Sequence, residues 1–196
     1  MLSSKNSLVV LKKTKALLEG HFVLSSGLHS SGYVQCAKLL SLPSISNKFT
    51  LSLSKKIKHK IKKIDLILSP AIGGIVIGYE IGRLLKKETI FCERIKGKFQ
   101  LRRGFSISKN SRVLIVEDVI TTGKSSLECV KLIKKSKAIL VGFACLIDRS
   151  SKKTLKIKGK KIISQIKLNL PTYKKNNLPI NIKNLPITKP GSRFLK

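Results

Sequence analysis

Two adjacent carboxylates, Glu117 and Asp118, stand directly after a short apolar run at residues 113–116. The length of that run and its β-branched residues predict a buried strand rather than a helix. Small polar residues with one glycine, Gly123, follow at 121–126 and lead into apolar positions at helical spacing. A strand that turns into a helix in this way offers free backbone N–H groups and the positive end of the helix dipole to an anion. We therefore expect a phosphate site at this turn.

The acid pair indicates what else the ligand carries. Two negative charges beside a phosphate would weaken its binding unless they contact another part of the ligand, and carboxylates accept hydrogen bonds strongly from paired hydroxyls. The implied ligand is a ribose 5-phosphate with its hydroxyls on Glu117 and Asp118. The simpler alternative is an ordinary strand-to-helix turn with a solvated acid pair. A nucleoside-triphosphate P-loop, which Gly123-Lys124-Ser125 suggests, is excluded because Asp118 occupies the place of its first glycine.

The run Val-Leu-Ile-Val-Glu-Asp-Val-Ile-Thr-Thr-Gly-Lys-Ser at 113–125 resembles the 5-phosphoribosyl-1-diphosphate motif of the type I phosphoribosyltransferases. The resemblance implies that Asp118 is catalytic as well as ribose-binding. The residues of this motif that it assigns to phosphoribosyl diphosphate are Glu117, Asp118, Val119, Ile120, Thr121, Thr122, Gly123, Lys124 and Ser125.

A second segment, residues 20–36, has two strand-like runs around a Ser/Gly-rich turn and is typical of a hairpin. It resembles the N-terminal segment of the orotate phosphoribosyltransferases, where it helps to build the hood that holds orotate. The resemblance implies that Tyr33 lies against the pyrimidine ring. Longer-chain members carry a lysine where this sequence has Ser25, so that contact is missing or comes from elsewhere. We interpret His29 as a structural turn residue.

The same resemblance gives roles to further positions. Gly73 lies in a tight turn at 69–74 that corresponds to the family's diphosphate turn, and its lack of a side chain lets a ligand approach the backbone. Simple packing of the turn is the alternative. Arg149 and Thr121 are placed on orotate, because a planar guanidinium suits the orotate carboxylate. An ordinary ion pair between Asp148 and Arg149 is the alternative there.

Residues 93–105 form a charged, glycine-containing connection that is too polar for the core. We interpret it as a mobile lid whose cations meet the departing diphosphate. It occupies the place of the family's flexible catalytic loop, which reaches across a dimer into the neighbouring site. Arg94 is the predicted diphosphate contact, and Lys96 or Lys98 the catalytic cation. The alternative is an exposed β-hairpin loop with solvated lysines.

The composition limits the possible partners. The chain of 196 residues carries 41 Lys and Arg against 9 Asp and Glu, a formal net charge of +32. Such a charge is typical of nucleic-acid-binding proteins. However, the lysines are spread along the whole chain and few aromatic residues accompany them, so we consider nucleic acid an unlikely partner. An anionic substrate would still gain from the field.

The four cysteines, Cys36, Cys92, Cys129 and Cys145, show no metal-ligand spacing, so no protein metal site is expected. We interpret them as buried free thiols of a reducing compartment.

The longest uncharged run, residues 66–79, is shorter than the ~20 residues of a membrane span. No secretory segment is evident at the N-terminus. The sequence predicts a protein of the cytoplasm, without a membrane partner.

Periodicity predicts helices at 8–19, 47–63 and 75–85, with another after Ser126. Strands are predicted at 64–68, 89–92, 113–116, 138–147 and 162–170. This order predicts an open, mostly parallel α/β sheet flanked by helices, with ligands at its carboxyl edge. We expect one domain over 1–196. Its core covers about 47–150, and a small hood comes from about 1–46 and 151–196.

The resemblance, which covers nearly the whole chain, implies transfer of phosphoribose from 5-phospho-α-D-ribose 1-diphosphate to orotate, giving orotidine 5-phosphate and diphosphate. It implies Mg²⁺ bound mainly through substrate oxygens, and a homodimer. Two alternatives remain open: a phosphoribosyltransferase for another base, and a non-catalytic regulator or nucleic-acid binder with this fold.

Overall fold

A computed structural model of the chain describes residues 2–24, 27–151, 154–155, 157 and 159–188. Ser25, predicted to replace a substrate-binding lysine, lies outside the described residues. So does nearly all of the Thr-Lys-Pro-Gly-Ser-Arg ending.

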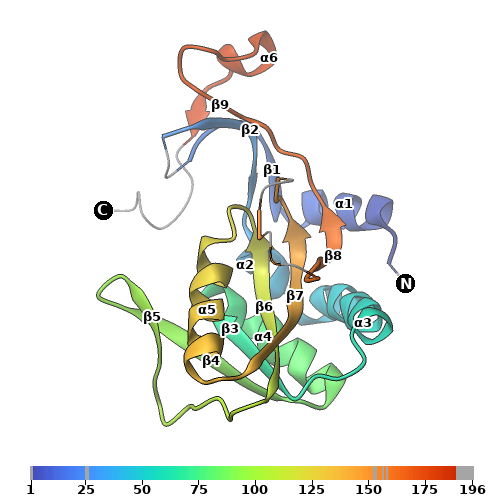
Figure 1. The fold of residues 1–196 in the computed structure, drawn as a ribbon. Coiled ribbons are helices and arrows are strands. Elements are labelled where there is room, and N and C mark those ends of the chain that lie inside the picture. Colours follow the sequence, from blue (N-terminus) through green and yellow to red (C-terminus); the bar gives the residue numbers. More distant parts are fainter. Residues whose placement is uncertain (1, 25–26, 152–153, 156, 158, 189–196) are drawn as a thin grey trace.

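A six-stranded sheet forms the centre of the molecule, in the order β5-β4-β3-β6-β7-β8 (Figure 1). Neighbouring strands pair in parallel except β4 and β5, which form an antiparallel hairpin. Parallel strands bring their carboxyl ends to one edge, where open α/β sheets bind ligands. The strands are β3 (Leu66–Pro70), β4 (Glu88–Ile95), β5 (Lys98–Leu101), β6 (Arg112–Ile120), β7 (Ile139–Asp148) and β8 (Ile162–Lys167).

Helices cover both faces of this sheet, which explains why its central strands contain continuous apolar runs. Residues 113–116 of β6 are fully buried, as is usual for parallel strands covered on both sides. One core cluster joins α1, α3 and α4 to one face, and a second packs α5 on the other. The helices are α1 (Ser4–Lys13), α3 (Pro43–Lys60), α4 (Gly73–Leu85) and α5 (Lys124–Lys135).

A second, four-stranded sheet stands beyond the carboxyl edge of the main sheet (Figure 1). Its order is β10-β1-β2-β9, so that the N-terminal hairpin is flanked on both sides by C-terminal strands. Both ends of the chain therefore build one hood over the edge where ligands are expected. Its elements are β1 (Leu17–Val23), β2 (His29–Val34), β9 (Thr172–Tyr173) and β10 (Ile187–Thr188), with α2 (Cys36–Leu40) and α6 (Ile180–Lys183) nearby.

The α/β architecture predicted from the sequence is confirmed, but the helix predicted at 8–19 is wrong in extent. It begins at Ser4 and ends at Lys13, and Lys15 has a left-handed φ of 55°. Leu17 then pairs with Val34 across the hairpin. The apolar pair at 17 and 18 fits a helical stripe equally well, but the strand pairing decides its conformation.

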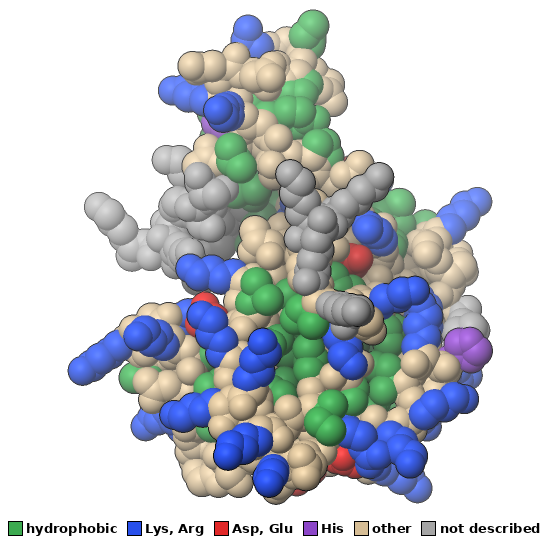
Figure 2. Space-filling model, viewed as in Figure 1, with side chains coloured by type: hydrophobic (Ala, Val, Ile, Leu, Met, Phe, Trp, Pro, Cys, Tyr) green, Lys and Arg blue, Asp and Glu red, His purple; other side chains and the backbone are tan. Residues whose placement is uncertain are grey.

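The lysines are spread over the surface, as the composition suggested. Figure 2 shows Lys and Arg side chains scattered over the visible face, between apolar and polar patches. They do not gather on one element in this view. In the described part of the chain, no helix is long and apolar enough to cross a membrane.

Candidate active site

The predicted phosphate loop lies between the end of β6 at Ile120 and the start of α5 at Lys124. Gly123 is left-handed at φ 73°, and an added Cβ would lie 2.6 Å from Cγ of Leu155. Both observations require glycine at this position. Thr121 and Thr122 are exposed in front of the helix N-terminus. The loop therefore presents backbone N–H groups to solvent, in a geometry suited to a phosphate.

Asp118 lies at the same edge of the sheet and is partly exposed. Its Oδ1 accepts a hydrogen bond of 2.8 Å from the backbone N–H of Val119, which fixes the direction of the carboxyl group. Burial raises the pKa of Asp118, while hydrogen bonds from the backbone act in the opposite sense. The group is held in place by the backbone and is short of polar partners, so hydroxyl donors from a ligand would stabilise its charged form.

Gly73, the first residue of α4 after the turn that follows β3, lies against Asp118. A Cβ at Gly73 would lie 2.8 Å from Oδ2 of Asp118, closer than real Cβ atoms come. The preceding Ala71–Ile72 peptide bond is cis. The predicted diphosphate turn and the predicted catalytic acid therefore meet at the carboxyl ends of two adjacent strands.

A cavity of about 550 Å³ opens beside Asp118, between α2 and α4. Its size is in the range of small-molecule sites. The contribution of α2 could not be predicted from the sequence, because a five-residue helix leaves no periodic signal. Residues that line the cavity with Asp118 are Gln35, Ala37, Leu40, Ser41, Ile72, Gly73 and Val76.

The other acid, Glu117, points elsewhere. Its side chain is only 8% exposed, and its Oε1 accepts a hydrogen bond from the hydroxyl of the fully buried Ser126. Burial raises the pKa of Glu117 to about 7, the Ser126 hydrogen bond opposes that rise, and Asp118 adds to it. The structure thus separates the two acids that the sequence placed together on ribose.

Arg149 and Tyr33 are two of the residues that were predicted to contact orotate. The backbone N–H of Arg149 donates to the carbonyl of Ile120 at 2.8 Å, so this residue borders the phosphate loop. Its Nε is buried without a hydrogen-bond partner among the described residues, and burial lowers the pKa of the guanidinium. Tyr33 packs on Phe22 with ring centroids 5.9 Å apart. Burial raises the pKa of Tyr33 and Asp118 raises it further, so the two side chains lie within electrostatic range.

The alternative of an ion pair between Asp148 and Arg149 does not occur between these two described residues. Asp148 instead accepts from the backbone N–H of Ser150 at 2.8 Å, and Lys167 lies 4.0 Å away. A half-buried guanidinium at a strand end, with an Nε that has no partner among the described residues, favours an anionic ligand over a structural role.

The predicted lid is largely a regular β-hairpin, formed by β4 and β5, so the structure takes the form that the sequence left as the alternative. Arg94 forms a two-pronged ion pair with Glu128 of α5, at 3.0 and 3.2 Å, and its guanidinium lies 4.1 Å from the centre of the Phe99 ring. Lys96 is exposed in the hairpin turn with a left-handed φ of 47°. The diphosphate contact predicted for Arg94 would require it to exchange Glu128 for the ligand.

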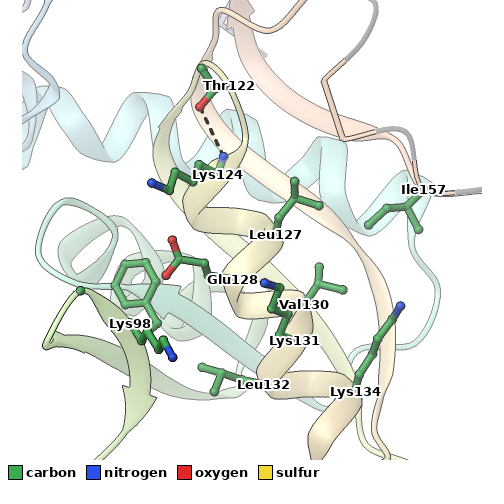
Figure 3. Close-up of a pocket in the computed structure, with 12 residues that line it drawn as sticks. Lys98, Thr122, Lys124, Leu127, Glu128, Val130, Lys131, Leu132, Lys134 and Ile157 are labelled. Carbon is green, nitrogen blue, oxygen red and sulfur yellow. Dashed lines mark hydrogen bonds between the residues drawn. The ribbon is translucent and has the colours of Figure 1, made fainter. Parts of the chain in front are cut away.

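A groove of about 760 Å³ separates the hairpin from α5 (Figure 3). Its upper end reaches the phosphate loop at Thr122 and Lys124, and Lys98 lies on the hairpin wall. Neither acid of the pair lines it, so we place the active site at Asp118 rather than in this larger groove. The remaining lining residues are Gly97, Phe99, Leu127, Glu128, Val130, Lys131, Leu132, Lys134 and Ile157.

Cysteine and histidine do not contribute metal sites in the part of the chain that the structure describes. No group of three or more His, Cys, Asp or Glu side chains there could hold a metal ion. All four cysteines are buried and free, and Sγ of Cys92 lies 3.5 Å from Sγ of Cys129. His29 and His21 share a buried hydrogen bond of 2.6 Å within the hood, which supports a structural interpretation of His29.

Comparisons with known proteins agree with this geometry. The phosphoribosyl transferase domain model matches residues 38–177. The orotate phosphoribosyltransferase of Parvibaculum lavamentivorans is 46% identical over 185 residues, which are 94% of both chains. That of Erythrobacter litoralis is 42% identical over 183 residues, which are 93% of this chain and 94% of the relative. The crystal structure of orotate phosphoribosyltransferase from Aeropyrum pernix superposes with a TM-score of 0.71 at 26% identity, over 82% of this chain and 92% of that chain. The chain therefore belongs to the phosphoribosyltransferase family, among relatives of its own length that are orotate phosphoribosyltransferases.

Proposed function

We propose that the protein transfers phosphoribose from 5-phospho-α-D-ribose 1-diphosphate to N1 of orotate, a step of pyrimidine nucleotide synthesis. One observation carries the proposal. The phosphate loop and Arg149 lie at the ends of adjacent strands, joined by the bond from the Arg149 N–H to Ile120, and the Arg149 Nε has no partner among the residues that the structure describes. A phosphate and a carboxylate-bearing base would thus be held side by side.

The reaction breaks the bond between the anomeric carbon and the diphosphate oxygen, and forms one from that carbon to N1 of orotate. Positive charge builds on the ribose as diphosphate leaves. The Asp118 carboxylate would fix the ribose hydroxyls and lie near that charge. The N–H groups before α5 would hold the 5-phosphate. On the base, Arg149 and Thr121 would bind the carboxylate, and Tyr33 would lie against the ring.

The leaving diphosphate needs compensating charge. We assign Arg94 to a diphosphate contact and Lys96 or Lys98 to the catalytic cation, all from the 93–105 segment. The turn at Gly73 would supply a further diphosphate contact through its backbone. Mg²⁺, when bound to the diphosphate, would neutralise part of its charge. The described residues offer no cluster of three metal ligands, so substrate oxygens and water would supply most of its coordination sphere.

A homodimer is part of the proposal. Three apolar side chains on one face of α4 and the turn before it are exposed: Ile72 by 86%, Val76 by 50% and Tyr79 by 65%. Their spacing of four and three residues aligns them in a single stripe. Ile72 and Val76 also line the cavity beside Asp118, so a partner packed on this stripe would border the active site. From that position a partner's 93–105 segment could reach the site.

The cytoplasm is the proposed location, on the basis of the four buried free thiols. Nucleic acid stays an unlikely partner because the lysines are spread along the whole sequence and do not gather in one patch on the face that Figure 2 shows.

An absorbance assay of orotate consumption with phosphoribosyl diphosphate and Mg²⁺ tests the function, with uracil, adenine and hypoxanthine run in parallel. We expect turnover with orotate alone. Turnover of another base would overturn the assignment of Arg149 and the hood. No turnover with any base, together with steeply salt-dependent DNA binding, would favour the non-catalytic alternative.

A further inference from the structure

The contact between Glu117 and Ser126 joins the acid pair to the phosphate-loop helix. Ser126 lies in the first turn of α5 and is fully buried, and Glu117 lies near the end of β6. The serine hydroxyl donates to Oε1 of Glu117. A serine near the start of a helix often caps its N-terminus. In α5, however, the N-cap residue is Gly123, and no side chain forms a capping hydrogen bond there.

The surroundings of Glu117 otherwise disfavour a negative charge. Asp118 adjoins it on β6, Cys129 approaches from α5, and Cys145 lies opposite it on β7. None of these groups carries a positive charge. The ion pairs of the described residues do not include Glu117. The hydroxyl of Ser126 is therefore the polar side chain that stabilises the carboxylate.

We propose that Ser126 is a positioning residue that fixes the Glu117 carboxylate to the first turn of α5 and favours its charged form. The helix that presents the phosphate loop thereby also controls the charge next to Asp118. Its consequence for catalysis rests on the proposed function, whereas the contact itself does not.

Three effects set the ionisation of Glu117. Burial favours the neutral acid, a hydrogen bond donated to the carboxylate favours the ion, and the neighbouring charge of Asp118 again favours the neutral acid. Their balance leaves the pKa at about 7, so the charge of Glu117 changes within the neutral range. When Glu117 is neutral, Asp118 is relieved of a repulsive neighbour. The charge next to Asp118 thus depends on a serine that does not line the cavity beside Asp118.

Carbon-13 NMR of the glutamate carboxyls in the substrate-free protein tests this directly. The chain contains only six glutamates, so selective labelling gives six resonances, and Glu117→Gln identifies the one from Glu117. We expect that resonance to titrate near pH 7 in the wild type. In Ser126→Ala it should titrate higher, by about one pH unit, the order of a single hydrogen bond. Ser136→Ala, at the far end of α5, is the matched control and should leave it unchanged.

Two outcomes would overturn the proposal. The Glu117 resonance could have the same titration midpoint as the exposed glutamates, or its midpoint could be the same in Ser126→Ala as in the wild type. Should the alanine variant not fold, Ser126→Cys, of similar volume but a weaker donor, must shift the midpoint in the same direction. In the orotate assay, the pH profile of kcat/KM should move with the NMR midpoint. Failure of orotate turnover would contradict the proposed function and leave the NMR result standing, so the two can be told apart.

Discussion

Gly73 and Asp118 approach so closely that a single methyl group does not fit between them. A Cβ at position 73 would lie 2.8 Å from Oδ2 and 3.0 Å from Oδ1 of Asp118. The first residue belongs to the turn after β3 and the second to the end of β6, which is the neighbouring strand. The geometry of one turn therefore constrains the acid on the other.

Gly73→Ala should displace the Asp118 carboxyl and lower kcat/KM for phosphoribosyl diphosphate by about tenfold. The backbone of Gly73 is not left-handed, so crowding rather than strain is the cause. A double-mutant cycle with Asp118→Asn checks the mechanism, since an effect that acts through Asp118 cannot add to its loss. Additive losses would show that Gly73 acts independently.

Asp118→Asn should leave the fold intact and reduce kcat by roughly 100-fold, the order seen for loss of one electrostatic contact in a transition state. The amide oxygen can still accept the bond from Val119, so the thermal midpoint should hardly change. Asp65→Asn removes an acid of the same type, paired with Arg112 at the opposite end of β6 from Asp118, and should keep full activity. A wild-type kcat in Asp118→Asn would contradict the catalytic assignment.

Arg149→Gln should raise the KM for orotate at least tenfold, with little change in the KM for phosphoribosyl diphosphate. The reason is that its buried Nε has no partner among the described residues and is therefore available to a carboxylate. Initial-rate measurements with each substrate varied in turn separate the two constants. Arg112→Gln, in the exposed pair with Asp65, is the matched control. Equal increases in both constants would indicate a general disturbance of the site.

Much of this fold could be predicted, because its central strands are continuous apolar runs and its phosphate loop combines a glycine with small polar residues. β6 and the turn at Gly123 illustrate this. A strand buried on both faces needs a continuous apolar run, and a left-handed turn residue favours glycine, so both features are visible in the sequence. The hood was expected from both termini, but the two-residue strands β9 and β10 carry no periodic signal of their own.

The fine structure of the site was harder to predict, because it depends on side-chain direction. Residues 117 and 118 are adjacent and alternate across the strand, so they cannot point the same way. The sequence interpretation nevertheless placed both on ribose. Only the three-dimensional structure shows Glu117 turned towards Ser126 and Asp118 towards Gly73. Likewise, the pairing of Arg94 with Glu128 joins residues 34 apart, beyond any local pattern.

Tyr79→Glu should convert the expected dimer to a monomer, because it places a charge on the exposed apolar stripe formed by Ile72, Val76 and Tyr79. Sedimentation velocity or light scattering over a range of concentrations measures this. Ile139→Glu, which alters another exposed apolar residue at the start of β7, should stay dimeric. If both variants behave as the wild type, the stripe is not the interface.

The raised pKa of Glu117 also predicts how stability depends on pH. In the unfolded chain this acid loses its proton near pH 4.5, whereas in the folded protein it does so near 7. Between these values the folded state holds a proton that the unfolded state has released, so stability falls as pH rises and levels off above about 7. The contribution is about 3 kcal/mol over the full range, since a difference of one in pKa corresponds to ~1.4 kcal/mol.

Glu117→Gln cannot titrate but can still accept a hydrogen bond from Ser126, so it should not show this loss of stability. Urea unfolding of both proteins at pH 5 and pH 8 measures the difference. We expect the wild type to lose roughly 2 kcal/mol more than the variant between the two conditions. Parallel changes would mean that Glu117 is already charged at pH 5, and that the buried carboxylate is stabilised by more than a single serine hydroxyl.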